Sequence, residues 1–130
     1  MATWTQVQER MREVFALDRD EADRFTVTIQ HDHGTHARAQ RVMGVRFTAW
    51  GHPMIEIRSA FGQVGDFDPD TLLLDNLQLP LGAVARHGGF YVLVYKAPLE
   101  HLTPEGVVFL VTRVGLVADA LEERHGADRF

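Results

Sequence analysis

The sequence predicts an α+β fold, a two-layer domain in which two terminal helices cover one face of a five-stranded antiparallel sheet. Apolar residues recur at helical spacing near both ends of the chain. The segments between them alternate apolar and polar residues with period two, which is typical of strands packed on one side only. The turns joining these segments are short enough to require antiparallel pairing. All of residues 1–130 are expected to form one domain with one core.

The first predicted element is an amphipathic helix over residues 3–17. Thr3 and Gln6 have the spacing of a capping box at its start. The apolar stripe consists of Trp4, Val7, Met11, Val14 and Phe15. The polar run that follows, residues 18–23, is interpreted as a connection.

Three strands are predicted between residues 25 and 58. The alternating apolar positions are Phe25, Val27 and Ile29 in the first strand, Met43, Val45 and Phe47 in the second, and Ile55 and Ile57 in the third. In the second strand the opposite face carries Arg38, Gln40, Arg46 and Thr48, and in the third it carries Glu56 and Arg58. Turn-forming residues at 31–34 and 50–53 separate the three strands.

Residues 70–96 predict a short helix, a break and a β-hairpin. Asp68 is expected to cap the helix and Pro69 to occupy its first position. Leu72, Leu73, Leu74 and Leu77 form the apolar stripe of about two helical turns. Asn76 and Pro80 end the helix, since proline has no N–H to donate. Gly88-Gly89 provides the tight turn between hairpin strands at residues 81–86 and 90–96.

A long helix is predicted to close the chain, from Thr103-Pro104 to Gly126. Its apolar face is composed of Val107, Leu110, Val111, Val114, Val117, Ala118 and Leu121. The predicted order is therefore helix, three strands, short helix, two strands and helix.

The phrase Asn76-Leu-Gln-Leu-Pro80-Leu-Gly82, after a leucine-rich helix, resembles the "N..LP.G" phrase of the YbjN family. That family shares its fold with the secretion chaperones of type III systems. The strand Phe90–Tyr95 and the end of the last helix, residues 118–122, also look like the family. The resemblance implies a small, acidic, cytoplasmic and usually dimeric protein that holds other proteins, with YbjN-like relatives associated with stress responses. The middle helix here is shorter than in the secretion chaperones, where it often contributes to the dimer interface.

Composition excludes several classes of site. The net charge of −5 argues against a surface whose main role is to bind phosphate groups. Without cysteine there is no disulfide, thiolate nucleophile or cysteine-ligated metal. The apolar runs fall short of the roughly 20 residues of a membrane span, and the N-terminus lacks the pattern of a secretory signal. We therefore expect a cytoplasmic protein that does not bind membranes.

Two clusters of polar residues have the composition of metal sites. His31, His33 and His36 lie within six residues, HDHGTH, and imidazole binds zinc or copper. The alternative is a polar hairpin turn, which we favour because the spacing matches no zinc motif. The second cluster consists of Asp66, Asp68, Asp70 and Asp75. It lacks the glycine and closing glutamate of a calcium loop, so a helix cap at Asp68 is the better interpretation. We predict no metal and no cofactor.

Catalytic motifs are also missing from the sequence. The only serine, Ser59, has no G-x-S-x-G elbow around it. No glycine-rich loop follows a strand and opens a helix, as phosphate binding would require. The sequence therefore predicts a non-enzymatic protein with no catalytic residues.

An apolar surplus in the last hairpin strand suggests a binding surface. The strand presents Tyr91, Leu93 and Tyr95 on one face and Phe90, Val92 and Val94 on the other, and only one face can meet the two long helices. We expect the other face to bind a partner. The predicted partner-binding residues are Arg46, Trp50, Met54, Arg58, Tyr91, Leu93 and Tyr95. The occupant is a second copy or a client segment; alternatively, the short leucine helix or the loop from Phe61 covers this face.

The predicted function is that of a chaperone-like adaptor, a homodimer that binds a protein client in the bacterial cytoplasm, with a stress response as one setting. The alternative is a module that binds nucleic acid or a small ligand on the sheet face. Arg38, Arg46 and Arg58 beside Trp50 could then stack on and neutralise a single strand. The net charge weighs against direct nucleic-acid binding.

Overall fold

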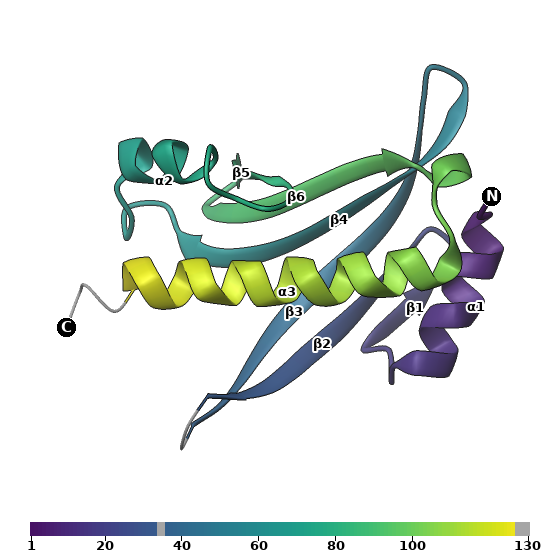
Figure 1. Cartoon of the computed structure of the whole chain (residues 1–130), viewed down its shortest axis with the longest axis horizontal. Helices are drawn as coiled ribbons and strands as arrows, with labels where there is room; N and C mark the ends of the chain where they lie inside the picture. The colour runs from purple at the N-terminus through teal and green to yellow at the C-terminus, as the bar shows by residue number, and fades with distance from the viewer. Residues whose placement is uncertain (34–35, 127–130) are drawn as a thin grey trace.

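The computed structural model describes residues 1–33 and 36–126, with residues 31–33, 36–37 and 126 described by their backbone alone. An antiparallel sheet forms one layer and the long helices the other (Figure 1). The strands are β1 (Arg19–Glu21), β2 (Arg24–His33), β3 (His36–Ala49), β4 (His52–Gln63), β5 (Ala83–His87) and β6 (Phe90–Pro98). The helices are α1 (Trp4–Val14), α2 (Pro69–Asp75) and α3 (Pro104–Gly126), and η1 (Leu99–His101) is a short 3-10 helix.

The sheet has six strands in the spatial order β1-β2-β3-β4-β6-β5, so the prediction of five strands was wrong. The extra strand, β1, lies in the segment interpreted as a connection and pairs with the start of β2. Its residues show no apolar alternation, which is why the sequence did not reveal it. Asp20 ties this edge strand to α1, because its carboxylate accepts hydrogen bonds from Arg12 at 2.6 and 2.9 Å and from Gln8 at 2.8 Å.

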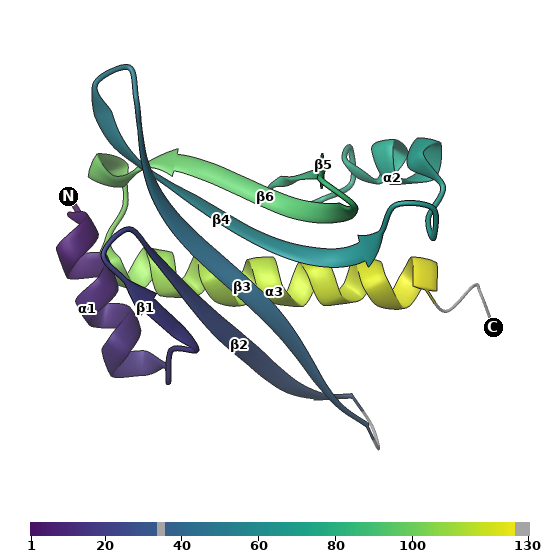
Figure 2. The same ribbon diagram turned by 180° about the vertical axis from the view of Figure 1, so that it is seen from behind.

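The core lies between the sheet and the two long helices, which cover the same face (Figures 1 and 2). Fully buried side chains from every layer meet there: Val7 and Met11 of α1, Phe25 and Val27 of β2, Val42 of β3, Ile55 and Ile57 of β4, Leu93 of β6, and Val107, Val111, Val114 and Ala118 of α3. The terminal helices and most strands thus follow the predicted apolar periodicity.

The face of β3 that meets the helices differs from the apolar face seen in its sequence. Antiparallel pairing sets Phe25 opposite Gly44, and a Cβ atom at Gly44 would lie 2.3 Å from Phe25 Cζ. The glycine therefore makes room for the Phe25 ring, which stacks on Trp4 with ring centroids 5.7 Å apart. Gln40 also faces inward, where its side-chain amide donates to Ser59 Oγ and the Ala60 carbonyl at 2.8 and 2.6 Å.

Candidate protein-binding surface

Helix α2 and the turn that follows it expose most of their leucines to solvent. Leu72 alone is fully buried, whereas Leu73, Leu74 and Leu77 are 61%, 69% and 84% exposed. The inward face of this short helix is shared by Leu72 and Asp75, three residues apart. We call the three exposed leucines, together with the groove described below, the leucine surface.

Polar contacts of Asp75 and Asn76 fix the orientation of α2. Asp75 pairs with the last turns of α3, where Arg124 Nη1 lies 3.1 Å from Oδ1 and His125 Nε2 lies 2.5 Å from Oδ2. The Asn76 side-chain oxygen accepts a hydrogen bond from the Val84 backbone at 2.6 Å. Gly82 completes the connection with a φ of +71°, and a Cβ there would lie 2.8 Å from the Val94 carbonyl. The Asn and Gly of the "N..LP.G" phrase thus join α2 to the β5–β6 hairpin.

An open groove of about 790 Å³ lies along α3 and begins at Gln78, the residue that follows Leu77. One wall is the segment after α2, and the other is the outer side of α3. Its apolar lining consists of Leu79, Pro80, Leu81, Tyr95, Phe109, Leu110, Leu116, Val117, Ala120 and Leu121. Arg113 and Arg124 also line it, and the Arg113 guanidinium lies 5.1 Å from the centre of the Phe109 ring. No carboxylate is among the described lining residues.

The other face of the sheet carries no helix of the described chain (Figure 2). We call it the open face. Strand pairing places Met43, Val45, Phe47, Met54, Val92 and Val94 on it. Met54 and Val92 are only 6% and 4% exposed, because neighbouring side chains cover them. Glu56 neutralises two cations on this face, with Arg58 at 3.0 Å and Lys96 at 3.6 Å.

The strand register divides the seven predicted partner-binding residues among separate places. Tyr95 pairs with Ile57 and therefore points to the helix side, together with Tyr91 and Leu93, which belong to the core. Tyr91 and Leu93 are 8% and 0% exposed, so the expectation that they share an exposed face with Met54 was wrong. The physical reason is that this parity depends on the β4–β6 register, which the sequence of one strand does not determine.

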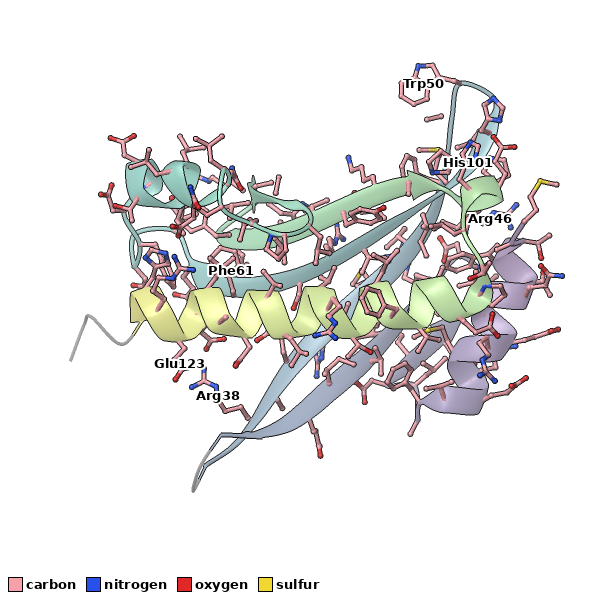
Figure 3. The ribbon with its side chains drawn as sticks, in the orientation of Figure 1. Arg38, Arg46, Trp50, Phe61, His101 and Glu123 are labelled. Carbon is pink, nitrogen blue, oxygen red and sulfur yellow. The ribbon has the colours of Figure 1, made fainter. Side chains whose placement is uncertain are left out.

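The remaining four predicted residues also lie apart. Met54 and Arg58 are on the open face. Arg46 pairs with the core residue Ile55 and so lies on the helix side, exposed near the end of the sheet. Trp50 stands at the tip of the β3–β4 hairpin, 88% exposed and away from the helices (Figure 3).

The arginines considered for nucleic-acid binding do not converge on Trp50. Arg38 lies at the far end of β3, where it forms an ion pair of 2.9 Å with Asp119 of α3 (Figure 3). The hydrogen bond to Asp119 raises the pKa of Arg38 above its usual value. Arg46 and Arg58 lie on opposite faces of the sheet. No single surface therefore holds the predicted cluster.

The two polar clusters that were considered as metal sites give no assembled site in the described part of the chain. The side chains of His31, His33 and His36 lie outside the described residues. Asp68 caps α2, as predicted: its carboxylate accepts from the Asp70 backbone and the Thr71 hydroxyl. Among the described residues, no three histidine, cysteine or acidic side chains are placed to hold a metal ion. No described helix is long and apolar enough to cross a membrane.

The groove was not predicted from the sequence. Phe109 is 57% exposed and was not assigned to the apolar face of the last helix. The available indication was that α3 carries more apolar residues than one stripe needs, because Leu116 and Phe109 lie outside the core-facing positions. Tyr95 was predicted as a surface residue but on the wrong face, and it lines the groove beside α3.

Comparisons with known proteins establish the fold. No family model matches the sequence, and no curated protein matches it, so membership of the YbjN family stays a prediction. A solved structure does match: a chain in the HopA1-SchA chaperone-effector complex. The TM-score is 0.56, and the match covers 92% of this chain and 91% of that one at 15% identity. The chain therefore has the fold of a protein found in a chaperone-effector complex.

Proposed function

We propose that this chain is a non-enzymatic, chaperone-like protein that binds another protein, and that two copies pair through the leucine surface. The observation that carries the proposal is the exposure of Leu73, Leu74 and Leu77 beside an apolar groove. Several large apolar side chains exposed in one region of a monomer mark an interaction site. The fold shared with a chain of a chaperone-effector complex supports the same conclusion.

A second copy is a suitable occupant because the surface has complementary parts. A two-fold interface must be self-complementary, so one patch has to supply both protruding and receiving groups. Here the leucines of α2 protrude, and the groove along α3 can receive them. Asp70 lies on the first turn of α2, and its carboxylate would be opposite in charge to Arg113 and Arg124 of the other copy. The groove along α3 would add apolar area to an interface that the short helix α2 could not provide alone.

Light scattering coupled to size-exclusion chromatography tests the dimer. We expect the protein to elute at twice the 14.7 kDa mass of one chain. Leu74→Asp places a carboxylate in the proposed interface and should yield a monomer. Val14→Asp is the matched control, because Val14 is 43% exposed but lies on α1, away from the leucine surface. A monomeric wild type at about 100 µM, a concentration far above a typical Kd for a stable dimer, contradicts the proposal.

The client contact is tested separately from the dimer. Trp50, Arg46, Met54 and Arg58 remain proposed contacts, and Trp50 is the most exposed of them. A tagged pull-down from native cytoplasm should recover one dominant protein with the wild type and lose it with Trp50→Ala. Equal recovery with the variant would remove Trp50 from the proposed site. The cytoplasmic setting and the stress response stay predictions.

A further inference from the structure

We propose that the open face binds a segment of a partner protein in which carboxylates flank an apolar side chain. The proposal rests on the proposed function and adds the chemistry of the client. A hollow of about 300 Å³ lies on this face, between the middle of the sheet and the end of the β5–β6 hairpin. The chemistry of its lining identifies the occupant.

The floor of the hollow is apolar. It is formed by Met43, Ala60, Phe90 and Val92, from three neighbouring strands. Phe90 is 47% exposed, although Val92 beside it in the same hollow is buried. An apolar side chain entering the hollow would remove this ring from water, with a free-energy gain of roughly 25 cal/mol for each Å² buried.

The rim of the hollow is basic. Arg41, Arg58 and His87 are its only polar lining residues, and no described carboxylate lines it. Arg58 is already paired with Glu56. Arg41 is exposed, and its guanidinium forms no ion pair with another described residue. On a chain with a net charge of −5, a free arginine beside an apolar hollow is a local reversal of charge.

A second hollow extends the surface toward β1. It is lined by Asp18, Arg19, Thr26, Arg41 and Met43, so the two hollows share Arg41 and Met43. Asp18 in this hollow accepts a hydrogen bond from the Thr28 hydroxyl at 2.6 Å. Arg41 is therefore placed between two depressions, where it can hold a carboxylate with two parallel hydrogen bonds while a neighbouring apolar side chain enters the first hollow.

Charge favours an acidic protein segment over nucleic acid. A nucleic-acid site would need several free cations along a backbone track and aromatic rings for the bases. The open face offers one unpaired arginine at this hollow, and Lys96 lies 5.8 Å from the Phe47 ring centre while also facing Glu56. A protein segment with one or two carboxylates could be neutralised by these two cations.

Synthetic probes test the inference directly. The first is a fluorescein-labelled heptapeptide, blocked at both ends, in which aspartate alternates with isoleucine, phenylalanine and valine. The second replaces each aspartate with lysine, and the third is a labelled thymidine 20-mer. Fluorescence anisotropy should show the acidic peptide binding at least about tenfold more tightly than the basic one, the change expected from one lost charge-assisted contact.

Matched variants locate the binding. Arg41→Gln and Arg41→Glu should each weaken binding of the acidic peptide, by about tenfold or more for the charge reversal. Phe90→Ala should also weaken it. Arg10→Glu, which reverses a partly exposed charge on α1, away from both the hollow and the leucine surface, should leave it unchanged.

Three outcomes overturn the inference: equal binding of the acidic and basic peptides, no binding of the acidic peptide at a concentration of about 1 mM, or binding that is insensitive to substitution of Arg41. Tighter binding of the thymidine 20-mer would replace the protein segment with nucleic acid. The light-scattering experiment is independent of these results. A dimer that fails to bind the peptide refutes this inference alone, and a monomer that binds it refutes the proposed pairing alone.

Discussion

Trp50 occupies a backbone position that usually belongs to asparagine or glycine. It and Gly51 form a two-residue hairpin loop, closed by the Ala49–His52 pair, with φ angles of +52° and +76°. Both signs match a type I′ turn, which favours Asn-Gly. A bulky L residue with positive φ is strained, and the exposed indole gains little from packing in the free chain. This strain at an exposed tryptophan is consistent with the partner contact proposed for it.

Replacing this tryptophan should therefore stabilise the protein. We expect Trp50→Asn to raise the free energy of unfolding by about 1 kcal/mol, since asparagine tolerates positive φ. Urea denaturation of both proteins measures the difference. Trp50→Ala is the control, because alanine removes the indole but retains a Cβ at the same φ, and its stability should change much less. An equal gain from both variants would show that the ring, not the backbone, carries the strain.

Gly44 is a second residue that the sequence alone could not explain. We expect Gly44→Ala to lower the free energy of unfolding by roughly 1–3 kcal/mol, since its Cβ would overlap the Phe25 ring. Gly89→Ala is the matched control, because no atom lies within 4 Å of a Cβ there. Thermal unfolding compares the two variants. A loss at Gly89 as large as that at Gly44 would mean that backbone freedom, rather than the aromatic contact, matters.

Local residue roles were predictable, and roles that depend on a distant partner were not. The Thr3–Gln6 capping box and the Asp68 cap were both predicted and are confirmed, because each depends on residues three positions apart or fewer. Gly44 is set by a ring on another strand, so its role appears only once β2 and β3 are in register.

At the scale of elements, β1 shows why the sequence predicted too few strands for the sheet. It has three residues, all exposed, so no apolar pattern marks it. Pairing with β2 and the Asp20 contacts to α1 hold it in place. The hydrogen bond from Arg12 is the largest cause that lowers the pKa of the Asp20 carboxyl, followed by charge attraction from the same arginine, while partial burial acts in the other direction.

This link should make stability depend on pH. A lowered pKa in the folded state means that the ionised carboxylate stabilises the fold above the pKa of the unfolded chain, and that this contribution disappears as the pH falls through the folded pKa. We expect Asp20→Asn to be less stable than the wild type at pH 7, with the difference disappearing as the pH falls through the lowered pKa of Asp20. Urea denaturation at several pH values measures it. Arg12→Gln should remove the same pH dependence; a constant difference at all pH values would rule out the ion pair as its origin.

The sequence could not predict which face of each strand meets the helices. Periodicity predicted the strands β4 and β6 but not the register in which they pair, where Leu93 lies opposite Ser59 and Tyr95 opposite Ile57. Because side chains alternate, a shift of one residue exchanges the two faces. In the observed register Tyr91 and Leu93 lie on the helix side with the core residue Ile57, and Val92 and Val94 lie on the open face.

At the scale of the whole molecule, the sheet separates two apolar surfaces. The leucine surface lies on the helix side, and the hollow with Arg41 lies on the open face. The two-layer α+β class could be predicted from periodicity, because it requires only the pattern of apolar residues, whereas the full order of elements could not, since β1 has no such pattern. The dependence on pattern alone is also why the fold persists at 15% identity. The surfaces could not be predicted, since each is composed of side chains from several elements.

Because the sheet separates the two surfaces, we expect the pairing of two copies and the binding of the acidic peptide to be independent of each other. We expect the double variant Leu74→Asp, Arg41→Glu to lose both pairing and binding of the acidic peptide, with each loss equal to that of its single variant. Residues this far apart with no shared contact usually have additive effects, within about 0.5 kcal/mol. Light scattering and anisotropy on the four proteins measure the two losses. A peptide affinity that falls in Leu74→Asp alone would show that pairing and client binding are coupled through the sheet.

The three-residue length of β1 also bears on how the protein behaves at high concentration. It covers β2 only from Arg24 to Thr26, and no described strand pairs with the outer edge of β2 beyond that point. Such an edge, with the sequence Val-Thr-Ile, can recruit strands from other molecules and start aggregation. Asp18 places a carboxylate there, since its backbone N–H donates to the Thr26 carbonyl and its side chain accepts from Thr28. We expect this carboxylate to act as a gatekeeper, so that its loss would reduce solubility before it reduced stability.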